Sequence, residues 1–281
     1  MNAAVVAPGP TRLRTVFCTC GGLYGALVLA RLRACAQLEI CGIVRSSRVL
    51  DPRFGFLQGA IAQIRRSGLA YALYLWCTTT LADWLCALND QSKRTPRGNP
   101  AAARLTTRDL NDSEGRAFLV KCAPDLLISS FFNQRLALET LTLPTLGCLN
   151  IHPSLLPDAK GVDPVFQALL HDGPPLGVTV HFMNEEFDAG RILAQQRLEP
   201  HRGASVFETT ALLYRDGAEL LANTVDRVVA GERGTLQNGP GTYQSWPTAA
   251  EISALRRRGG ALLHFMDFVR LARARLPHPK A

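Results

Sequence analysis

Short β-favouring runs alternate with helical segments along the first part of the chain, and this alternation constrains the fold more than any other feature. Residues 15–20 (TVFCTC) form a strand-like run, which a glycine-rich turn joins to the helical sequence ALVLARLRA at residues 26–34. A second strand-like run follows at residues 38–44 (LEICGIV). Strands separated by helices are typical of a parallel sheet with crossover helices, so the sequence predicts an α/β fold.

The rest of the chain extends the same pattern. A third strand is predicted at residues 125–130, and further strands at 146–151 and 177–183. Residues 205–229 predict one long helix, because their apolar positions recur at intervals of three and four. Residues 89–104 are rich in charge, proline and glycine, which indicates a surface loop within the long connection between the second and third strands.

The length of 281 residues suits one large α/β domain with a small appendage. We expect a loose N-terminal arm at residues 1–14, which lacks the apolar region of a signal peptide. The main domain then covers residues 15–230, with an insertion at about 54–110. A short tail at 231–281 packs on it and contains a basic helix from residue 249 to about 276.

A twenty-residue apolar segment at residues 69–88 carries a single charge, Asp83. A membrane-spanning helix is one interpretation. Three consecutive threonines dilute its apolarity, however, and favour a helix that is buried in a core or against a partner. This segment is therefore our candidate for the interface of a homodimer, and no membrane span is expected.

Charge and cysteine content narrow the class of protein only a little. The net charge of +8 favours anionic partners, and contact of the tail with nucleic acid or a membrane is a weaker alternative. The eight cysteines show no repeated pair at zinc spacing, so we interpret them as reduced thiols of a cytoplasmic protein. His171, His181 and His201 lack the helical spacing of a metalloprotease, and no metal is expected.

Residues 150–190 contain the side chains best suited to chemistry. Asn150 and His152 are two positions apart at the end of a predicted strand, so their side chains point to the same face at the edge where open α/β sheets bind ligands. Asp188 follows the next strand, and it faces His152 if the two strands are neighbours. An amide, an imidazole and a carboxylate together suit the attack of a nucleophile on a carbonyl. Taken alone, the same side chains also fit a strand end whose polar groups only satisfy buried backbone groups.

These residues lie within a longer pattern that resembles the formyltransferase family that uses 10-formyltetrahydrofolate. The separation of 38 positions between Asn150 and Asp188 is similar to that of the methionyl-tRNA formyltransferase branch. The resemblance covers roughly residues 13–200 and is strongest at 148–195. It rests on Asn150-Ile151-His152, Ser154-Leu155-Leu156-Pro157, Lys160-Gly161, Asp163-Pro164, Gly177-Val178-Thr179 and Asp188-Ala189-Gly190.

The resemblance implies a Rossmann-like fold, mostly a parallel sheet with helices on both faces, and assigns roles to individual residues. Asn150 and His152 would polarise the formyl group, and Asp188 would orient His152 and a water that moves protons. The folate would be held largely by backbone groups of two loops, at Phe132, Asn133, Gln134, Arg135, Leu136, Asn184, Glu185 and Glu186. The acceptor would contact Gly21, Gly22, Ser154, Lys160 and Gly161.

The sequence departs from the family pattern at residues that are expected to contact the acceptor. Asp158-Ala159 stands where family members commonly have an aromatic residue or arginine, and the tail looks too short for a tRNA-binding barrel. We therefore expect a small-molecule amine such as an amino sugar nucleotide or an amino acid derivative. A methionyl-tRNA formyltransferase and a non-catalytic folate-binding relative remain alternatives. Gly21 and Gly22 also fit tight packing of the first helix on its strand, without any ligand.

Overall fold

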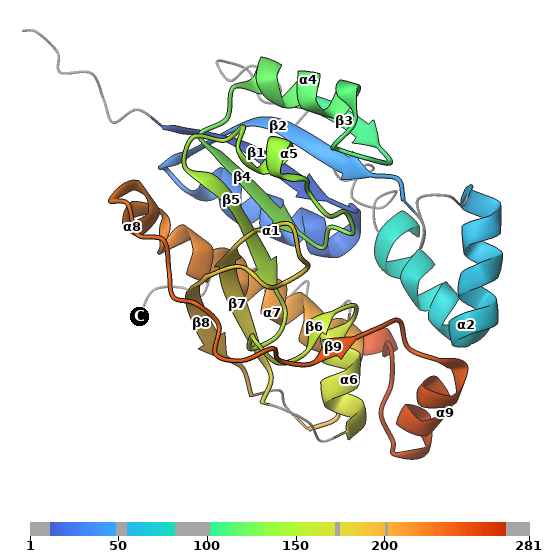
Figure 1. Cartoon of the computed structure of the whole chain (residues 1–281). Helices are drawn as coiled ribbons and strands as arrows, with labels where there is room; N and C mark the ends of the chain where they lie inside the picture. The colour runs from blue at the N-terminus through green and yellow to red at the C-terminus, as the bar shows by residue number, and fades with distance from the viewer. Residues whose placement is uncertain (1–11, 49–54, 82–101, 172–174, 200–201, 268–281) are drawn as a thin grey trace, which may run out of the picture.

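The computed structural model describes residues 12–48, 55–81, 102–171, 175–199 and 202–267 (Figure 1). Its centre is a seven-stranded sheet with the order β3-β2-β1-β4-β5-β7-β8. The first five of these strands are parallel, whereas β7 and β8 run antiparallel to their neighbours β5 and β7, respectively. The strands are β1 (Leu13–Thr19), β2 (Leu38–Ser46), β3 (Ala103–Thr107), β4 (Leu126–Ser130), β5 (Gly147–His152), β7 (Gly177–Phe182) and β8 (Ile192–Arg197).

Helices cover both faces of this sheet, which confirms the predicted α/β fold. On one face α1 (Gly22–Ala34) packs against α7 (Val206–Ala222) over the larger core, which includes Phe17, Leu126 and Ile128. On the other face α4 (Ser113–Cys122) packs on β1, β2 and β3, and the short α5 (Leu138–Leu141) lies over the same smaller core. The strands β1 and β4 are almost wholly buried, as expected of central parallel strands.

Two strands of the sheet were not predicted. The strand β3 lies partly in the segment that was interpreted as a loop, and it pairs with β2 at one edge of the sheet. The strand β8 pairs with β7 at the opposite edge. Both are mostly polar and partly exposed, because an edge strand has only one neighbour and needs no continuous apolar run.

Two predicted helices are shorter than expected. The helix predicted at 205–229 ends at Ala222, after which Asn223 and Thr224 separate it from α8 (Val225–Val229). The basic helix begins at residue 249 as predicted, but α9 (Ala249–Arg257) ends before Gly259, whose φ of 80° is left-handed. Residues 268–276 of that prediction lie outside the described residues.

The predicted insertion contains a helical arm at its start. The helix α2 (Phe56–Trp76) kinks at Gly68, where φ is 80°, and continues into one turn of π-helix, η1 (Cys77–Leu81). The arm packs against α9 and against α1, beyond the edge of the sheet (Figure 1). Within the described part of the chain, no helix is long and apolar enough to cross a membrane. Residues 82–88 of the apolar segment, and the loop at 89–101, lie outside the described residues.

The tail runs back across the carboxyl end of the main sheet. Its strand β9 (Tyr243–Gln244) pairs in parallel with β6 (Lys160–Gly161), a two-residue strand in the loop between β5 and α6 (Pro164–His171). This small second sheet brings residues from the end of the chain next to the loop that follows Asn150 and His152 (Figure 1).

Candidate active site

The polar side chains of β5 and β7 meet because these strands are antiparallel neighbours. Asn150 lies opposite His181, and His152 lies opposite Thr179. Side chains two positions apart on a strand share a face, so all four point to the same side of the sheet. Asn150 is partly exposed, whereas the other three side chains are buried.

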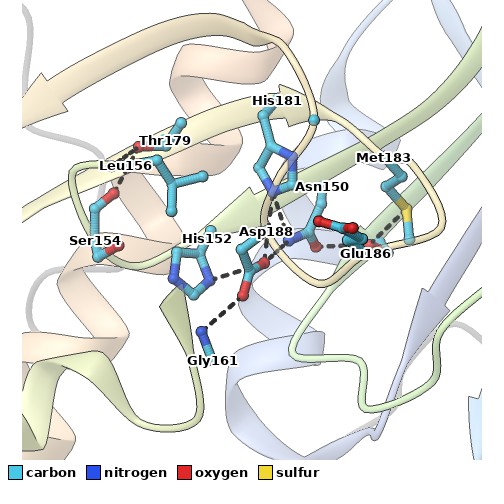
Figure 2. A network of polar contacts seen from close by, with 12 residues as sticks. Asn150, His152, Ser154, Leu156, Gly161, Thr179, His181, Met183, Glu186 and Asp188 are labelled. Atoms are coloured by element: carbon cyan, nitrogen blue, oxygen red, sulfur yellow. Dashed lines mark hydrogen bonds and ion pairs between the residues drawn. The ribbon is translucent and has the colours of Figure 1, made fainter. Parts of the chain in front are cut away.

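Asp188 completes this group from the loop that follows β7 (Figure 2). Its Oδ1 lies 3.4 Å from Nδ2 of Asn150, 3.4 Å from Nδ1 of His152 and 3.6 Å from Nε2 of His181. Its Oδ2 accepts a 2.9 Å hydrogen bond from the backbone N–H of Gly161. The residue adopts a left-handed φ of 53°, a conformation that aspartate tolerates better than most residues. The predicted approach of Asp188 to His152 is therefore observed.

Asp188 is the charged member of the group. Burial acts to raise the pKa of this carboxyl, but the His152 imidazole and the Gly161 N–H act in the opposite direction, and the net effect holds its pKa well below the usual range. The carboxylate is therefore ionised at neutral pH.

His152 is placed to receive a proton. Burial lowers the pKa of its imidazole, against the opposing effect of Asp188. Its Nε2 lies 3.0 Å from the carbonyl oxygen of Ala159, and because that oxygen only accepts, Nε2 carries the proton. A second proton at Nδ1 would lie between the imidazole and Oδ1 of Asp188. Nδ1 is therefore the basic atom of His152, and the Asp188 carboxylate beside it would stabilise the imidazolium that forms when Nδ1 is protonated.

The orientation of the Asn150 amide follows from its neighbours. Its Oδ1 accepts a 2.6 Å hydrogen bond from the Ser129 hydroxyl on β4, so its NH₂ group faces Asp188 and His181. His181 holds a hydrogen bond from Nδ1 to the Phe182 carbonyl oxygen, which leaves Nε2, 3.1 Å away, to accept from Asn150. The amide is thereby held as a hydrogen-bond donor at the partly exposed end of β5.

The loop after β4, predicted to hold folate, is itself firmly held. The buried side chain of Gln134 accepts from the Leu110 N–H at 2.7 Å and donates to the Ser46 hydroxyl at 2.8 Å. Asn133 donates to the Arg48 carbonyl oxygen at 2.9 Å, and Leu136 is buried in the smaller core, against which Phe132 also packs. Most of these side chains point away from solvent, so the loop presents mainly backbone groups to a ligand.

The second predicted folate loop lies against the first. Arg135 donates from Nε to the carbonyl oxygen of Glu185 at 2.8 Å, which joins the two loops directly. Within the second loop, Asn184 accepts from the N–H of Glu186 at 3.2 Å, and both glutamates are exposed. Ser129, which donates to Oδ1 of Asn150, also lies 3.4 Å from the sulfur of Met183, the residue before this loop. The structure therefore brings the two predicted folate loops into contact and links the second to Asn150 through Ser129.

The residues predicted to contact an acceptor are brought together only in part. Ser154 is buried and donates to the Asp158 carbonyl oxygen at 3.1 Å, so it fixes its own loop. Lys160 donates from Nζ to the Pro240 carbonyl oxygen at 3.0 Å, and Gly161 contacts Asp188 as described above. Gly21 and Gly22 lie at the start of α1, where a Cβ on Gly22 would stand 2.2 Å from the Thr78 carbonyl oxygen of η1. This close approach explains the need for glycine at position 22.

Sequence reasoning missed two contributors to this site. His181 was considered only as a metal ligand, although Thr179 and His181 repeat the two-residue spacing of Asn150 and His152 on the neighbouring strand. Gln237 in the tail donates to the carbonyl oxygens of Asp188 and Gly190, both at 2.8 Å. Its distance along the chain left no local signal. Across residues that the structure describes, no group of three or more His, Cys, Asp or Glu is arranged to hold a metal ion.

Comparison with known proteins agrees with this geometry. A family model described as formyl transferase matches residues 54–222. Methionyl-tRNA formyltransferase of Lysinibacillus sphaericus is 36% identical over 124 residues, which cover 43% of this chain and 38% of that protein. The same enzyme of Bacillus licheniformis is 37% identical over 108 residues, covering 38% of this chain and 34% of that protein. The matches thus span about two fifths or less of these relatives.

Solved structures share the fold at lower identity. A sugar N-formyltransferase of a Shewanella species has a TM-score of 0.55 and 17% identity, covering 86% of this chain and 78% of that chain. Phosphoribosylglycinamide formyltransferase of Anaplasma phagocytophilum has a TM-score of 0.55 and 18% identity, covering 84% and 100%. Since the family model spans more than half of the sequence, this chain belongs to the formyl transferase family.

Proposed function

We propose that this protein transfers a formyl group from 10-formyltetrahydrofolate to the amine of a small-molecule acceptor. One observation carries the proposal: the Asn150 amide, the His152 imidazole and the Asp188 carboxylate converge within 3.4 Å at the end of β5. This set of groups suits acyl transfer, because it combines an oxyanion donor with a proton carrier and an anion that stabilises it. Asn150, His152 and Asp188 are accordingly our proposed catalytic residues.

The loops at residues 132–136 and 184–186 suit the folate donor. The Arg135–Glu185 bond joins them, and Ser129 links Met183, the residue before the second loop, to the partly exposed Asn150. Side chains such as Gln134 are turned inward, which leaves backbone N–H and C=O groups to contact the edge of a flat ring. When bound, the donor supplies a formyl carbon attached to a nitrogen leaving group.

Each catalytic side chain then has a separate task. The Asn150 NH₂ group donates to the formyl oxygen as negative charge develops there. His152, which is neutral at rest and basic at Nδ1, accepts the proton that the attacking amine loses and becomes an imidazolium. Asp188 stabilises this imidazolium and orients a water through which the same proton passes to the departing nitrogen, so that His152 returns to its neutral form. The Gly161 N–H fixes the other carboxylate oxygen and so sets its direction.

The acceptor class is inferred from the surroundings of the loop at residues 158–163. The tail contacts this loop through β9 and through the Thr242 hydroxyl, which accepts from the Ala159 N–H at 2.9 Å. Residues 237–244 therefore pack on the domain that carries the proposed catalytic residues. A tail used in this way supports a compact acceptor and not a tRNA. The second candidate acceptor is methionyl-tRNA, which the names of the sequence relatives favour. A folate-binding protein without transfer activity is the third.

The test is binding of a non-transferable 10-formyltetrahydrofolate analogue, followed by calorimetry and melting temperature. We expect the analogue to stabilise the wild-type protein, because a ligand that binds only the folded state raises the melting temperature. Asp188→Asn is compared with Asp216→Asn, which removes a partly exposed aspartate of α7 from its ion pair with the neighbouring Arg215. Absence of any shift at saturating analogue, in the wild type, contradicts the folate assignment.

A mass-spectrometric acceptor screen then separates the three candidates. Amino sugar nucleotides, amino acid derivatives and methionyl-tRNA are each incubated with donor, and a gain of one formyl group is sought. Formylation of the tRNA alone overturns the small-molecule proposal. Donor binding without formylation of any acceptor favours the non-catalytic alternative.

A further inference from the structure

We propose that Tyr71 is a positioning residue for formyl transfer: its hydroxyl holds the ionised Asp163 carboxylate, which fixes the loop whose Gly161 N–H orients Asp188. The proposal rests on the function proposed above. It assigns a role to the helical arm α2, which lies outside the catalytic strands and to which the function gives no task.

The contact between the arm and the loop is direct. The Tyr71 hydroxyl donates to Oδ2 of Asp163 at 2.7 Å. The other carboxylate oxygen, Oδ1, accepts from the Phe166 N–H at 3.3 Å in the first turn of α6. Asp163 thus connects α2 to α6, and it does so from a left-handed φ of 47°, which needs such contacts to persist.

The same loop carries the hydrogen bond to the catalytic carboxylate. Gly161 lies two residues before Asp163, and its N–H donates to Asp188 at 2.9 Å. The Val162 N–H between them donates to the Gln244 carbonyl oxygen at 2.8 Å. A Cβ at position 161 would stand 2.3 Å from that same oxygen, so the loop is closely confined on its tail side. Tyr71 holds the same loop through Asp163.

The arm is anchored well enough to act as a fixed support. Tyr71 is buried and its ring lies 6.4 Å from those of Phe166 and Trp246. One turn earlier, Ser67 donates to the Pro247 carbonyl oxygen, and Arg66 donates to the Ser245 hydroxyl at 2.7 Å. The tail therefore holds α2 at the position from which Tyr71 reaches Asp163.

The environment makes Asp163 sensitive to pH. Burial raises the pKa of its carboxyl to about 6, and the hydrogen bonds from Tyr71 and Phe166 act in the opposite direction. The titratable groups that face it are phenols: Tyr71 and Tyr74 from α2, Tyr24 from α1 and Tyr214 from α7. Burial raises the pKa of each phenol, so all remain neutral while Asp163 titrates.

The Gly161 amide signal gives a test that does not depend on activity. Lys160-Gly161 is the only Lys-Gly pair in the chain, so ¹³C-carbonyl lysine with ¹⁵N-glycine labels this one amide for NMR. In the wild type we expect its shift to follow a titration with a midpoint near pH 6, as Asp163 ionises. Tyr71→Phe should move the midpoint to higher pH, because the lost hydroxyl favours the ionised carboxyl.

Two further variants make the test decisive. Asp163→Asn should abolish the titration midpoint. Tyr74→Phe is the control and should leave the midpoint unchanged, because the Tyr74 hydroxyl contacts Tyr24, at 2.9 Å. A midpoint that persists in Asp163→Asn belongs to another group, such as His152, and overturns the proposal. An unchanged midpoint in Tyr71→Phe also overturns it.

Activity measurements then connect the loop to catalysis. At neutral pH Tyr71→Phe should lower kcat about three- to tenfold, the effect of one modest hydrogen bond, with KM for the donor within about twofold. The acidic limb of its pH profile should move upwards together with the NMR midpoint. If no acceptor is formylated by the wild type, the proposed function fails while the NMR result still decides the link from Tyr71 to Gly161. An NMR response without any change in kcat overturns the positioning role.

Discussion

Two sets of residues surround Asp188, and they are held in different ways. Asn150 and His152 lie on β5, which is paired on both sides by β4 and β7. Gly161 and Asp163 lie in a loop with left-handed backbone, which is held by Tyr71 through Asp163 and by residues 242–244 through Lys160 and Val162. The first set is positioned by the sheet itself, whereas the second depends on contacts between distant parts of the chain. The proposed catalytic side chains of β5 and the loop that orients Asp188 therefore have separate structural supports.

The largest expected effect on activity comes from a substitution on β5. Asn150→Ala should lower kcat about 100- to 1000-fold, because it removes a fixed donor to the developing oxyanion. Its melting temperature should stay within a few degrees of wild type, because the backbone pairing of β5 is unchanged. Asn223→Ala, an exposed residue at the end of α7, is the matched control in both the steady-state assay and calorimetry. Activity near the wild-type level in Asn150→Ala would remove this residue from the mechanism.

A substitution in the loop that contains Gly161 and Asp163 should lower both activity and stability. Gly161→Ala places a Cβ against the Gln244 carbonyl oxygen at a φ of 96°, so we expect an unfolding free energy lower by about 2 kcal/mol and kcat lower by roughly tenfold. Gly203→Ala is the control, since its φ of 75° gives similar backbone strain with nothing within 4 Å of the new Cβ. Equal losses in the two variants would show that backbone strain alone, and not the site, is affected.

A smaller effect is expected from the tail. Gln237→Ala removes two hydrogen bonds to the carbonyl oxygens of Asp188 and Gly190, which should cost about 1 kcal/mol of stability and lower kcat a few-fold. Gln196→Ala on β8, where the side chain is exposed, provides the comparison in chemical denaturation and in rate measurements. A kcat equal to that of the control would separate the tail from the catalytic loop.

Stability should also change with pH, through Asp163. Asp163 has a folded pKa of about 6 against an ordinary value of 3.8, so the folded state binds the proton more tightly. Its contribution to stability is present below pH 3.8 and is lost as the pH rises through 6. Asp163→Asn, which stays neutral, should therefore be more stable than wild type at pH 8, by about 3 kcal/mol. At pH 4 the two proteins should melt at similar temperatures, and a constant difference across this range would contradict the assignment.

Much of the sheet and part of the site were predictable from the sequence. Central strands such as β1 and β4 are continuous apolar runs, because both of their faces are covered by helices. The edge strands β3 and β8 have exposed polar positions, so no such run marked them. Asn150 and His152 were found because a spacing of two on a strand is a local property that implies a shared face.

Other parts of the site had no local signal. His181 repeats that spacing on β7, yet its meaning depends on the pairing of β5 with β7, which spacing alone does not establish. The contact between Tyr71 and Asp163 joins positions 92 residues apart, and that between Gln237 and Asp188 joins positions 49 apart. Neither contact leaves a periodic pattern, because loop positions are determined by tertiary packing.

The contacts of the tail also bear on the order of events during synthesis. Asn150, His152 and Asp188 leave the ribosome well before residues 237–244, which supply the last partners of the catalytic loop. A nascent chain that has completed α7 has the strands of the main sheet and the helix that supplies much of the larger core, and domains begin to fold as they emerge. Such a chain still lacks the strand that pairs with β6. The loop at residues 158–163 therefore gains its hydrogen bonds from the tail only after synthesis has passed Gln244.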